Sequence, residues 1–215
     1  EEMTPLDYAK NLAEERNSHM NMIVKILYDL EHINDQDDKG NTPLHNEIII
    51  EDYLMIRALL EYKADPNIRN NDDKFPLYLA FNLNDTLIVS ILLQNGAYPN
   101  VKYDEGNTLL HIACIDNNTQ MIQELVHRKK TEGRADSNIT NNNGKFPLNY
   151  LLDNYYKYMN AINSSNAINS SNVDILLDYI ELLLKNGASP NITNNTNNTN
   201  GWTPLHYAVK HKMND

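Results

Sequence analysis

Apolar residues recur along the chain in short runs whose spacing is typical of amphipathic helices. The clearest run is Leu87–Leu93, with apolar side chains at helical spacing. A shorter apolar segment, such as Leu109–Ile115, comes before a run of this kind. A polar stretch with turn residues, such as Asp37–Asn41, comes before the short segment. The pattern predicts a unit of two antiparallel helices joined by a turn and followed by a hairpin-like loop.

Two landmarks repeat in phase along the chain. The first is a tetrapeptide similar to Thr-Pro-Leu-His, which begins at Thr4, Thr42, Phe75, Thr108, Phe146 and Thr203, with spacings of 38, 33, 33, 38 and 57 residues. The second is an Asn that lies 8 residues before the next tetrapeptide at Asn34, Asn67, Asn100 and Asn138, and 12 residues before it at Asn191. The fold is therefore expected to consist of copies of one unit.

The residues of these landmarks have physical roles at helix ends. Thr followed by Pro is typical of a helix N-cap and of the first helical position, where the missing N–H costs nothing. Gly96 and Gly187 follow long helical runs and favour the left-handed backbone that ends a helix. Phe75 and Phe146 replace the capping Thr, so weaker caps are expected there. Lys63 stands in place of the helix-ending Gly, so we expect mild backbone strain at this position.

These motifs resemble the ankyrin consensus over essentially the whole chain. The stretches that carry the resemblance are Gly40–His45, Gly106–Ala113, Gly201–Ala208, Tyr62–Asn67 and Asn95–Asn100. The resemblance implies an all-α ankyrin-repeat solenoid of stacked helix-turn-helix units with hairpin loops, in about five full repeats plus a partial sixth. We expect one domain over residues 1–215, with repeats at 1–36, 37–69, 70–102, 103–140, 141–197 and 198–215.

The fifth repeat carries extra residues of a different composition. The hexapeptide Asn160–Ser165 is repeated without change as Asn166–Ser171. Such an Asn/Ser-rich segment cannot bury a core, so an inserted loop is expected at residues 160–172, at the helix–helix turn and away from the hairpin tips. The extra residues of the fourth repeat are expected to form the charged segment Arg128–Arg134.

Charge and composition narrow the class of partner. The chain has 29 acidic and 18 basic residues and a net charge of -11, a field that repels nucleic acid and anionic membrane surfaces and attracts basic protein surfaces. No apolar run approaches the roughly 20 residues that span a bilayer, so no membrane insertion is expected. The single cysteine, Cys114, favours a reducing compartment. We expect a cytoplasmic protein, or one delivered into the cytosol of a host cell.

Residues that could carry chemistry are dispersed by the repeat. His45, His111 and His206 occupy one position of three repeats, so each is expected to bond its capping Thr and the neighbouring loop instead of a shared metal ion. Cys114 is expected in the core, with a reactive thiol as the alternative. No Cys-x-x-Cys, His-Glu-x-x-His or glycine-rich phosphate loop occurs. We therefore expect no catalytic residue, no cofactor, no metal and no enzyme activity.

The ankyrin resemblance implies a partner protein bound on a concave surface of hairpin tips and first helices. On the first helices, apolar contact residues are predicted at Ile49, Ile50, Leu83 and Ile115. On the hairpins, the predicted contact residues are Asp38, Lys39, Asn41, Asn71, Asp72, Lys74, Asp104, Glu105, Asn107 and Trp202. Trp202 is either an anchor for the partner or a local contact with the preceding helix. The acidic tips either steer a basic ligand or only solubilise the rim.

We interpret the chain as a monomeric, non-enzymatic protein-interaction module whose partner carries basic and apolar residues. Its Asn-rich, divergent repeats resemble ankyrin proteins of obligate intracellular bacteria and large DNA viruses, which implies a host protein as partner. The alternative is a substrate-recruiting segment of a larger enzyme or ubiquitin-ligase adaptor, whose catalytic or adaptor domain lies outside this chain. Because the chain stops inside the first helix of the sixth repeat, we expect the natural sequence to continue.

Overall fold

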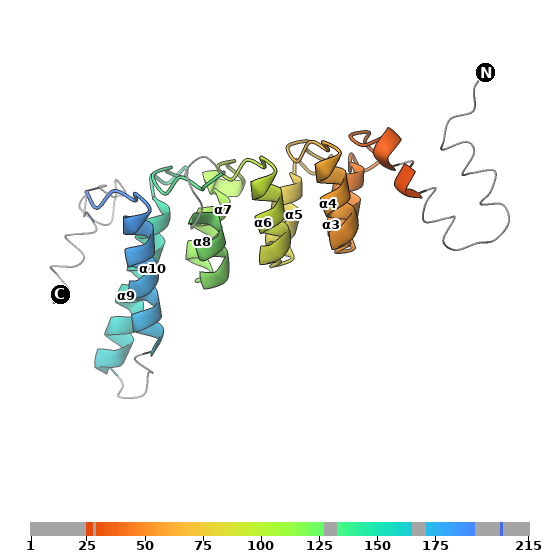
Figure 1. Ribbon diagram of the computed structural model, residues 1–215. Coiled ribbons are helices and arrows are strands. Elements are labelled where there is room, and N and C mark those ends of the chain that lie inside the picture. The colour runs from red at the N-terminus through yellow and green to blue at the C-terminus, as the bar shows by residue number, and fades with distance from the viewer. Residues whose placement is uncertain (1–24, 28, 127–132, 165–170, 192–202, 204–215) are drawn as a thin grey trace, which may run out of the picture. The chain divides into compact units, whose positions relative to one another are not determined.

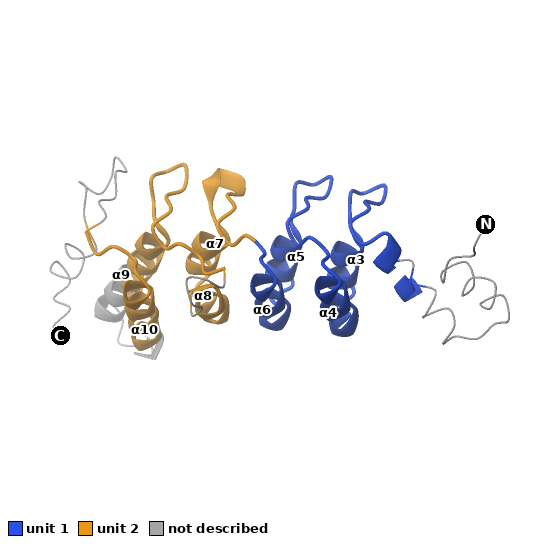
Figure 2. Cartoon of the chain, turned by 45° about the horizontal axis from the view of Figure 1, so that its top comes forward, with its two compact units in different colours: residues 1–97 blue, residues 98–215 orange. Residues whose placement is uncertain are grey.

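The computed structural model describes residues 25–27, 29–126, 133–164, 171–191 and 203 (Figure 1). These residues form helices and loops without a β-strand among them, which confirms the all-α prediction. The chain divides into two compact units, residues 1–97 and 98–215, called unit 1 and unit 2 below (Figure 2). The second and third predicted repeats, 37–69 and 70–102, belong mainly to unit 1, and the fourth and fifth, 103–140 and 141–197, belong to unit 2.

Unit 1 contains two stacked helix pairs. The second repeat forms α3 (Pro43–Ile49) and α4 (Tyr53–Glu61), and the third forms α5 (Pro76–Asn82) and α6 (Thr86–Gln94). The two helices of each pair contact each other, while α3 also contacts α5 and α4 contacts α6. In Figure 2 the hairpin loops of unit 1 rise from the side of α3 and α5, and α4 and α6 lie on the opposite side.

Unit 2 repeats this arrangement. Its first hairpin contains a short 3-10 helix, η1 (Asp104–Gly106), and the fourth repeat continues with α7 (Leu109–Ile115) and α8 (Thr119–Val126). The fifth repeat forms α9 (Pro147–Ser164) and α10 (Ser171–Lys185). Since α7 contacts α9 and α8 contacts α10, first helices stack on first helices and second helices on second helices.

The core of each unit consists of aliphatic residues that the helical period places on facing sides of the helices. Burying each such side chain contributes roughly 1.5–3 kcal/mol. Most of these contacts lie between neighbouring helices, so the stability of a repeat depends on the next one. The buried residues include Leu44, Ile48, Ile56, Leu59, Leu77, Ile88 and Leu92 in unit 1, and Leu109, Leu110, Met121, Ile122 and Leu125 in unit 2.

The ends of the second helices follow from a few residues. The carboxylates of Asp52 and Asp85 accept backbone N–H groups of the first turns of α4 and α6 at 3.0 and 2.9 Å. Gly96, after α6, has a φ of 88°. Lys63, after α4, has a φ of 74°, which confirms the predicted strain because a left-handed backbone costs a side-chain-bearing residue about 1–2 kcal/mol.

The fifth repeat is helical at residues 160–164 and 171–172, which corrects both ends of the loop predicted at 160–172. Helices α9 and α10 contain 18 and 15 residues, and α9 continues to Ser164 through most of the first copy of the duplicated hexapeptide. Residues 165–170 lie outside the described part of the chain, as does most of the charged segment predicted at 128–134. No Gly or Pro interrupts the sequence between Pro147 and Gly187, and Asn costs a helix at most about 0.7 kcal/mol relative to Ala. A helix can therefore continue as far as Ser164, into the first copy of the hexapeptide.

Candidate functional site

In unit 1 the hairpin of the third repeat is bonded to the hairpin of the second. The backbone N–H of Asn71 donates to the carbonyl of Lys39 at 3.0 Å, and Asn70 Nδ2 donates to Asn41 Oδ1 at 3.0 Å. Asn70 also shapes its own hairpin, since its Oδ1 accepts the backbone N–H groups two and four residues ahead. One amide side chain thus forms a turn and fixes it to the preceding hairpin.

His45 connects the cap of α3 to the next repeat. Its Nε2 lies 3.2 Å from the carbonyl oxygen of Lys74, while Nδ1 lies 3.1 Å from Thr42 N and 2.8 Å from Thr42 Oγ1. Because Nε2 faces a carbonyl, it carries the proton, and Nδ1 accepts from Thr42. The ring is fully buried, and burial lowers the pKa of His45 although the Lys74 carbonyl opposes this effect. The predicted role of His45 at the cap and the neighbouring loop is confirmed.

Unit 2 contains the same set of bonds between the fourth and fifth repeats. We call each such set, with the residues that form it, a junction. The equivalent bonds join Asn142 N to Glu105 O at 2.9 Å, Asn141 Nδ2 to Asn107 Oδ1 at 2.8 Å, and His111 Nε2 to Lys145 O at 3.0 Å. His111 Nδ1 also lies 2.8 Å from Thr108 Oγ1, so the same predicted role is confirmed for His111. His206 lies outside the described residues.

A glycine allows the hairpins of each junction to approach closely. A Cβ added to Gly40 would lie 2.4 Å from Asn71 Oδ1 and 2.6 Å from Asn71 N. A Cβ on Gly106 would lie 2.2 Å from Asn142 Oδ1. Both glycines also have positive φ values, 74° and 72°. A side chain at either position would therefore both strain its own backbone and displace the next hairpin.

The junction residues alternate from repeat to repeat. The second and fourth repeats carry Gly-Asn-Thr before the first helix and a His at its third residue, whereas the third and fifth carry Lys-Phe-Pro-Leu. Phe75 has no side-chain cap bond, as predicted, while Phe146 N donates to Asn149 Oδ1 at 2.8 Å. In each unit the first kind of repeat supplies the Gly, the Asn acceptor and the His, and the second kind supplies the Asn amide and the Lys carbonyl. The structural period is thus two repeats.

We call the hairpin tips and first helices of a unit its inner face. On the inner face of unit 1, Ile49 and Ile50 follow each other at the end of α3 with exposed fractions of 51% and 63%, and Leu83 follows α5 with 42%. On the inner face of unit 2, Ile115 ends α7 and is 39% exposed. The four side chains are exposed, as the repeat register requires, and large exposed apolar groups of this kind are common where proteins meet.

The predicted hairpin residues divide into two groups. Six are exposed: Asp38, Lys39, Asn71, Asp72, Asp104 and Glu105. Lys74 is half-buried, with its ammonium 4.2 Å from the centre of the Tyr78 ring. Asn41 and Asn107 are each only 7% exposed because their side chains bond the next hairpin, so we correct their predicted role from partner contact to junction residue. Trp202 lies outside the described residues.

The reactive side chains of the described residues serve the fold. Cys114 is fully buried, and burial raises the pKa of its thiol far above its ordinary value, which disfavours the reactive thiolate and fits its predicted core position. Burial is also the main cause of the lowered pKa of His111. No group of three or more His, Cys, Asp or Glu residues in the described ranges could hold a metal ion. None of the helices within those ranges has the length and apolarity to cross a membrane.

Repeats in which a hairpin, a first helix and a second helix each stack on their counterparts in the next repeat define a repeat solenoid. Two family models agree with this architecture: ankyrin repeats (3 copies) at residues 11–103 and 77–163, and ankyrin repeats (many copies) at residues 167–214. The chain belongs to the ankyrin-repeat family, which confirms the resemblance noted in its sequence. Arrays of this family generally act as protein-interaction modules.

Two solved structures show how far the likeness in fold extends. The crystal structure of EF0377, an ankyrin repeat protein, has a TM-score of 0.60 and 24% identity, and the match covers 99% of this chain and 94% of that one. An ankyrin repeat domain from Acinetobacter baumannii AYE has a TM-score of 0.63 and 22% identity, with 97% and 91% covered. At these identities the likeness concerns the fold alone. No curated protein matches the sequence.

Proposed function

We propose that this chain binds a partner protein through the inner face of unit 1. The observation that carries the proposal is the exposed apolar patch of Ile49, Ile50 and Leu83, since the apolar centre of an interface is its most strongly binding part. The repeat fold does not demand apolar residues there. Eight residues after the cap, where unit 1 has Ile50 and Leu83, unit 2 has Asp116 and Asn154. The patch is thus particular to unit 1.

Acidic residues on the hairpins define the chemistry of the proposed partner. Asp38 and Asp72 are exposed on the two hairpins of unit 1, and the chain carries a net charge of -11. We infer that the partner presents basic residues beside its apolar ones, because complementary charge accelerates association. Unit 2 presents Ile115, Asp104 and Glu105 on its own inner face, as a second and more polar contact surface.

The proposal includes the state and place in which the chain works. It acts as a monomer, since its net charge opposes self-association, and its binding role needs neither a catalytic residue nor a cofactor. Its partner is a cytosolic protein of a host cell. This part of the proposal is supported by the Asn-rich, divergent repeats, which resemble ankyrin proteins of intracellular bacteria and large DNA viruses.

Kinetic binding with a partner captured from host cytosol tests the surface. The double variant Ile50→Ala, Leu83→Ala is expected to dissociate faster and to lose about 1–3 kcal/mol of binding free energy. The matched control is Leu54→Ala, Leu87→Ala, which truncates residues that are 81% and 50% exposed on α4 and α6, the opposite side of unit 1. It should bind like wild type.

A second arm of the same measurement tests the acidic rim. Reversing Asp38 and Asp72 to Lys should slow association and flatten its dependence on salt, since exposed charges act mainly on the association rate. The opposite result is that the Leu54, Leu87 variant loses its partner while the patch and rim variants bind normally. The partner would then contact the second helices α4 and α6, and the proposed inner face would be wrong.

A further inference from the structure

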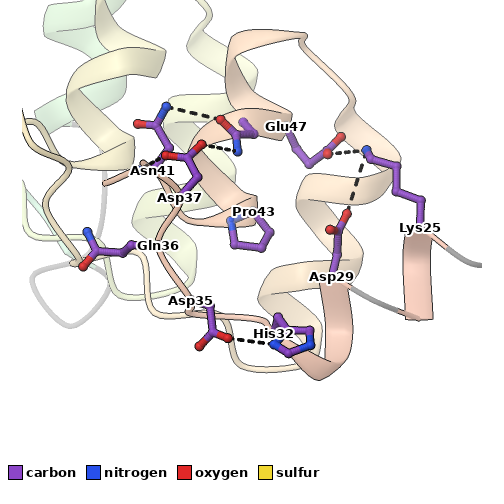
Figure 3. A pocket seen from close by; sticks show the side chains of 10 residues that line it. Lys25, Asp29, His32, Asp35, Gln36, Asp37, Asn41, Pro43 and Glu47 are labelled. Atoms are coloured by element: carbon purple, nitrogen blue, oxygen red, sulfur yellow. Dashed lines mark hydrogen bonds and ion pairs between the residues drawn. The ribbon is translucent and has the colours of Figure 1, made fainter. Parts of the chain in front are cut away.

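A pocket of about 220 Å³ lies in unit 1 between α3 and the residues that precede it (Figure 3). Four of the residues that line it are acidic: Asp29, Asp35, Asp37 and Glu47. The pocket also contains Lys25 and His32, and His32 is paired with Asp35 at 2.7 Å. Carboxylates therefore outnumber cationic groups around this space.

Glu47 is the least expected of these residues. It lies in α3 five residues after the cap and is only 2% exposed. The same position holds Ala80 in α5, Ala113 in α7 and Leu151 in α9, all of them buried. The fold accepts small or apolar residues there, and burying a carboxylate opposes folding unless the charge is well paired. A role in binding would account for the acid at this position.

The pairing of the buried carboxylates is incomplete. Lys25 Nζ donates to Glu47 Oε1 at 2.5 Å and lies 3.8 Å from Asp29 Oδ2, and Figure 3 shows both carboxylates turned toward this one ammonium. Among the described residues, Glu47 Oε2 and Asp29 Oδ2 are buried without a hydrogen-bond partner. Two carboxylates thus share a single cation.

The pKa values in the pocket agree with this excess of negative charge. Burial raises the pKa of Asp29; the charge of Lys25 opposes the shift, and the charge of Glu47 adds to it. For Lys25, burial alone would lower the pKa, but the hydrogen bond and the charge of Glu47 more than compensate and raise it. A second cation beside Asp29 would oppose the effect of burial on its pKa.

We propose that this pocket binds the guanidinium group of an arginine side chain from the partner protein. A guanidinium has five donors in a planar fork, which suits Glu47 Oε2, without a hydrogen-bond partner, and Asp29 Oδ2, which has only the 3.8 Å ion pair with Lys25. The pocket is smaller than the roughly 300 Å³ at which sites for small molecules begin, so it suits one side chain. Asn46, which also lines the pocket, lies one helical turn before Ile50 at the end of α3, so an arginine held here would place its neighbours near the apolar patch. The inference therefore rests on the proposed function.

Titration of the full chain with N-acetyl-arginine amide, followed by NMR, tests the pocket without the partner. We expect saturable shifts of the backbone amides of Asp37, Asn46 and Glu47. The matched probe N-acetyl-citrulline amide, which has nearly the same shape and no charge, should give none. Shifts that do not saturate, or that appear equally with citrulline, would overturn the proposal.

Two variants at Glu47 show whether its charge is responsible. Glu47→Ala installs the residue that α5 and α7 have at this position, so it should fold, and Glu47→Gln keeps the size of the side chain and removes the charge. Both should weaken binding of the arginine probe about tenfold or more. The control Glu61→Gln makes the same change at an exposed residue at the end of α4, outside the pocket, and should bind as wild type. Equal binding by wild type and the Glu47 variants contradicts the inference.

The outcomes separate this inference from the proposed function. If the arginine probe binds as expected but the Ile50, Leu83 variant holds its partner like wild type, the apolar patch fails and the pocket stands. If that variant loses its partner while the arginine probe does not bind, the patch stands and the arginine pocket is wrong.

Discussion

The junctions of unit 1 and unit 2 use the same bonds, while their inner faces differ. In both units a His donates to a Lys carbonyl, an Asn amide bonds an Asn of the preceding hairpin, and a Gly admits the next hairpin. On the inner faces, Ile50 and Leu83 of unit 1 correspond to Asp116 and Asn154 of unit 2, where Asn154 Nδ2 donates to Asn117 Oδ1 at 2.9 Å. Junction residues are constrained by the neighbouring repeat, whereas inner-face residues can change with what they bind.

The largest effect is expected from adding a side chain to the glycine at which the two hairpins of a junction approach each other closely. Gly40→Ala should lower the free energy of unfolding by about 3 kcal/mol, the sum of left-handed strain and overpacking against Asn71. Gly144→Ala is the matched control, because its φ is 68° and a Cβ would meet nothing within 4 Å; it should cost only about 1–2 kcal/mol. Denaturant unfolding measures both. Equal costs would show that the two kinds of hairpin do not differ in the way described.

A smaller effect is expected from removing the histidine of a junction. His111→Ala should cost roughly 2 kcal/mol, because Thr108 loses its acceptor and the Lys145 carbonyl loses its donor. His111→Asn should cost about 1 kcal/mol, since Asn149 shows that Asn at this position still accepts the cap N–H. If the Asn variant is as unstable as the Ala variant, the bond to the Thr108 cap and the bond to the Lys145 carbonyl do not contribute separately to stability.

The same histidine predicts a dependence on pH. Burial lowers the pKa of His111 below the value of about 6.5 that it has when unfolded. Its contribution to stability is therefore fully present above about pH 6.5, and it decreases as the pH falls from there through the folded pKa, because the unfolded state binds the proton more readily. The stability difference between wild type and His111→Asn should shrink on acidification in denaturant titrations. A difference that stays constant down to about pH 5 would contradict the buried neutral ring.

The smallest effect concerns a helix end at which the two units differ. The second repeat of unit 1 has Lys63 with a φ of 74°, whereas the fifth repeat of unit 2 has Gly187 with a φ of 94°. Lys63→Gly should stabilise the chain by about 1 kcal/mol through relief of left-handed strain, raising Tm by about 2–4 °C in a chain of this size. Lys63→Ala removes the charge without relieving the backbone and should bring no gain. A gain of the same size from Ala would mean that charge, and not φ, is the cause.

Much of the architecture could be predicted because it depends on spacing within one repeat. The register placed His45 and His111 at the caps, Cys114 in the core, and Ile49 and Ile50 on the surface. It misplaced Asn41 and Asn107, because the family's average repeat does not show which side chain the next hairpin supplies. The signal was available in the sequence, since Asn70 and Asn141 recur at one position of the following repeats.

Two other features depend on context that spacing does not contain. The length of α9 follows from the absence of helix-breaking residues and from packing against α10, neither of which the Asn/Ser composition reveals. The pocket around Glu47 arises because Lys25, Asp29 and His32 of the preceding repeat lie beside α3, a contact that spacing within one repeat does not contain. Glu47 itself could have been noticed, as an acid at a position where neighbouring repeats have Ala.

The alternation of junction residues limits how such a gene can lengthen or shorten. Loss of the third repeat alone would place the second repeat before the fourth, whose Tyr103 stands where the third and fifth repeats have Asn70 and Asn141 and offers no amide to Asn41. Loss of the second and third repeats together would leave the first repeat followed by one with Gly-Asn-Thr, as before. Descendants of this gene that gain or lose repeats by recombination are therefore expected to differ by even numbers, with the pair as the heritable unit.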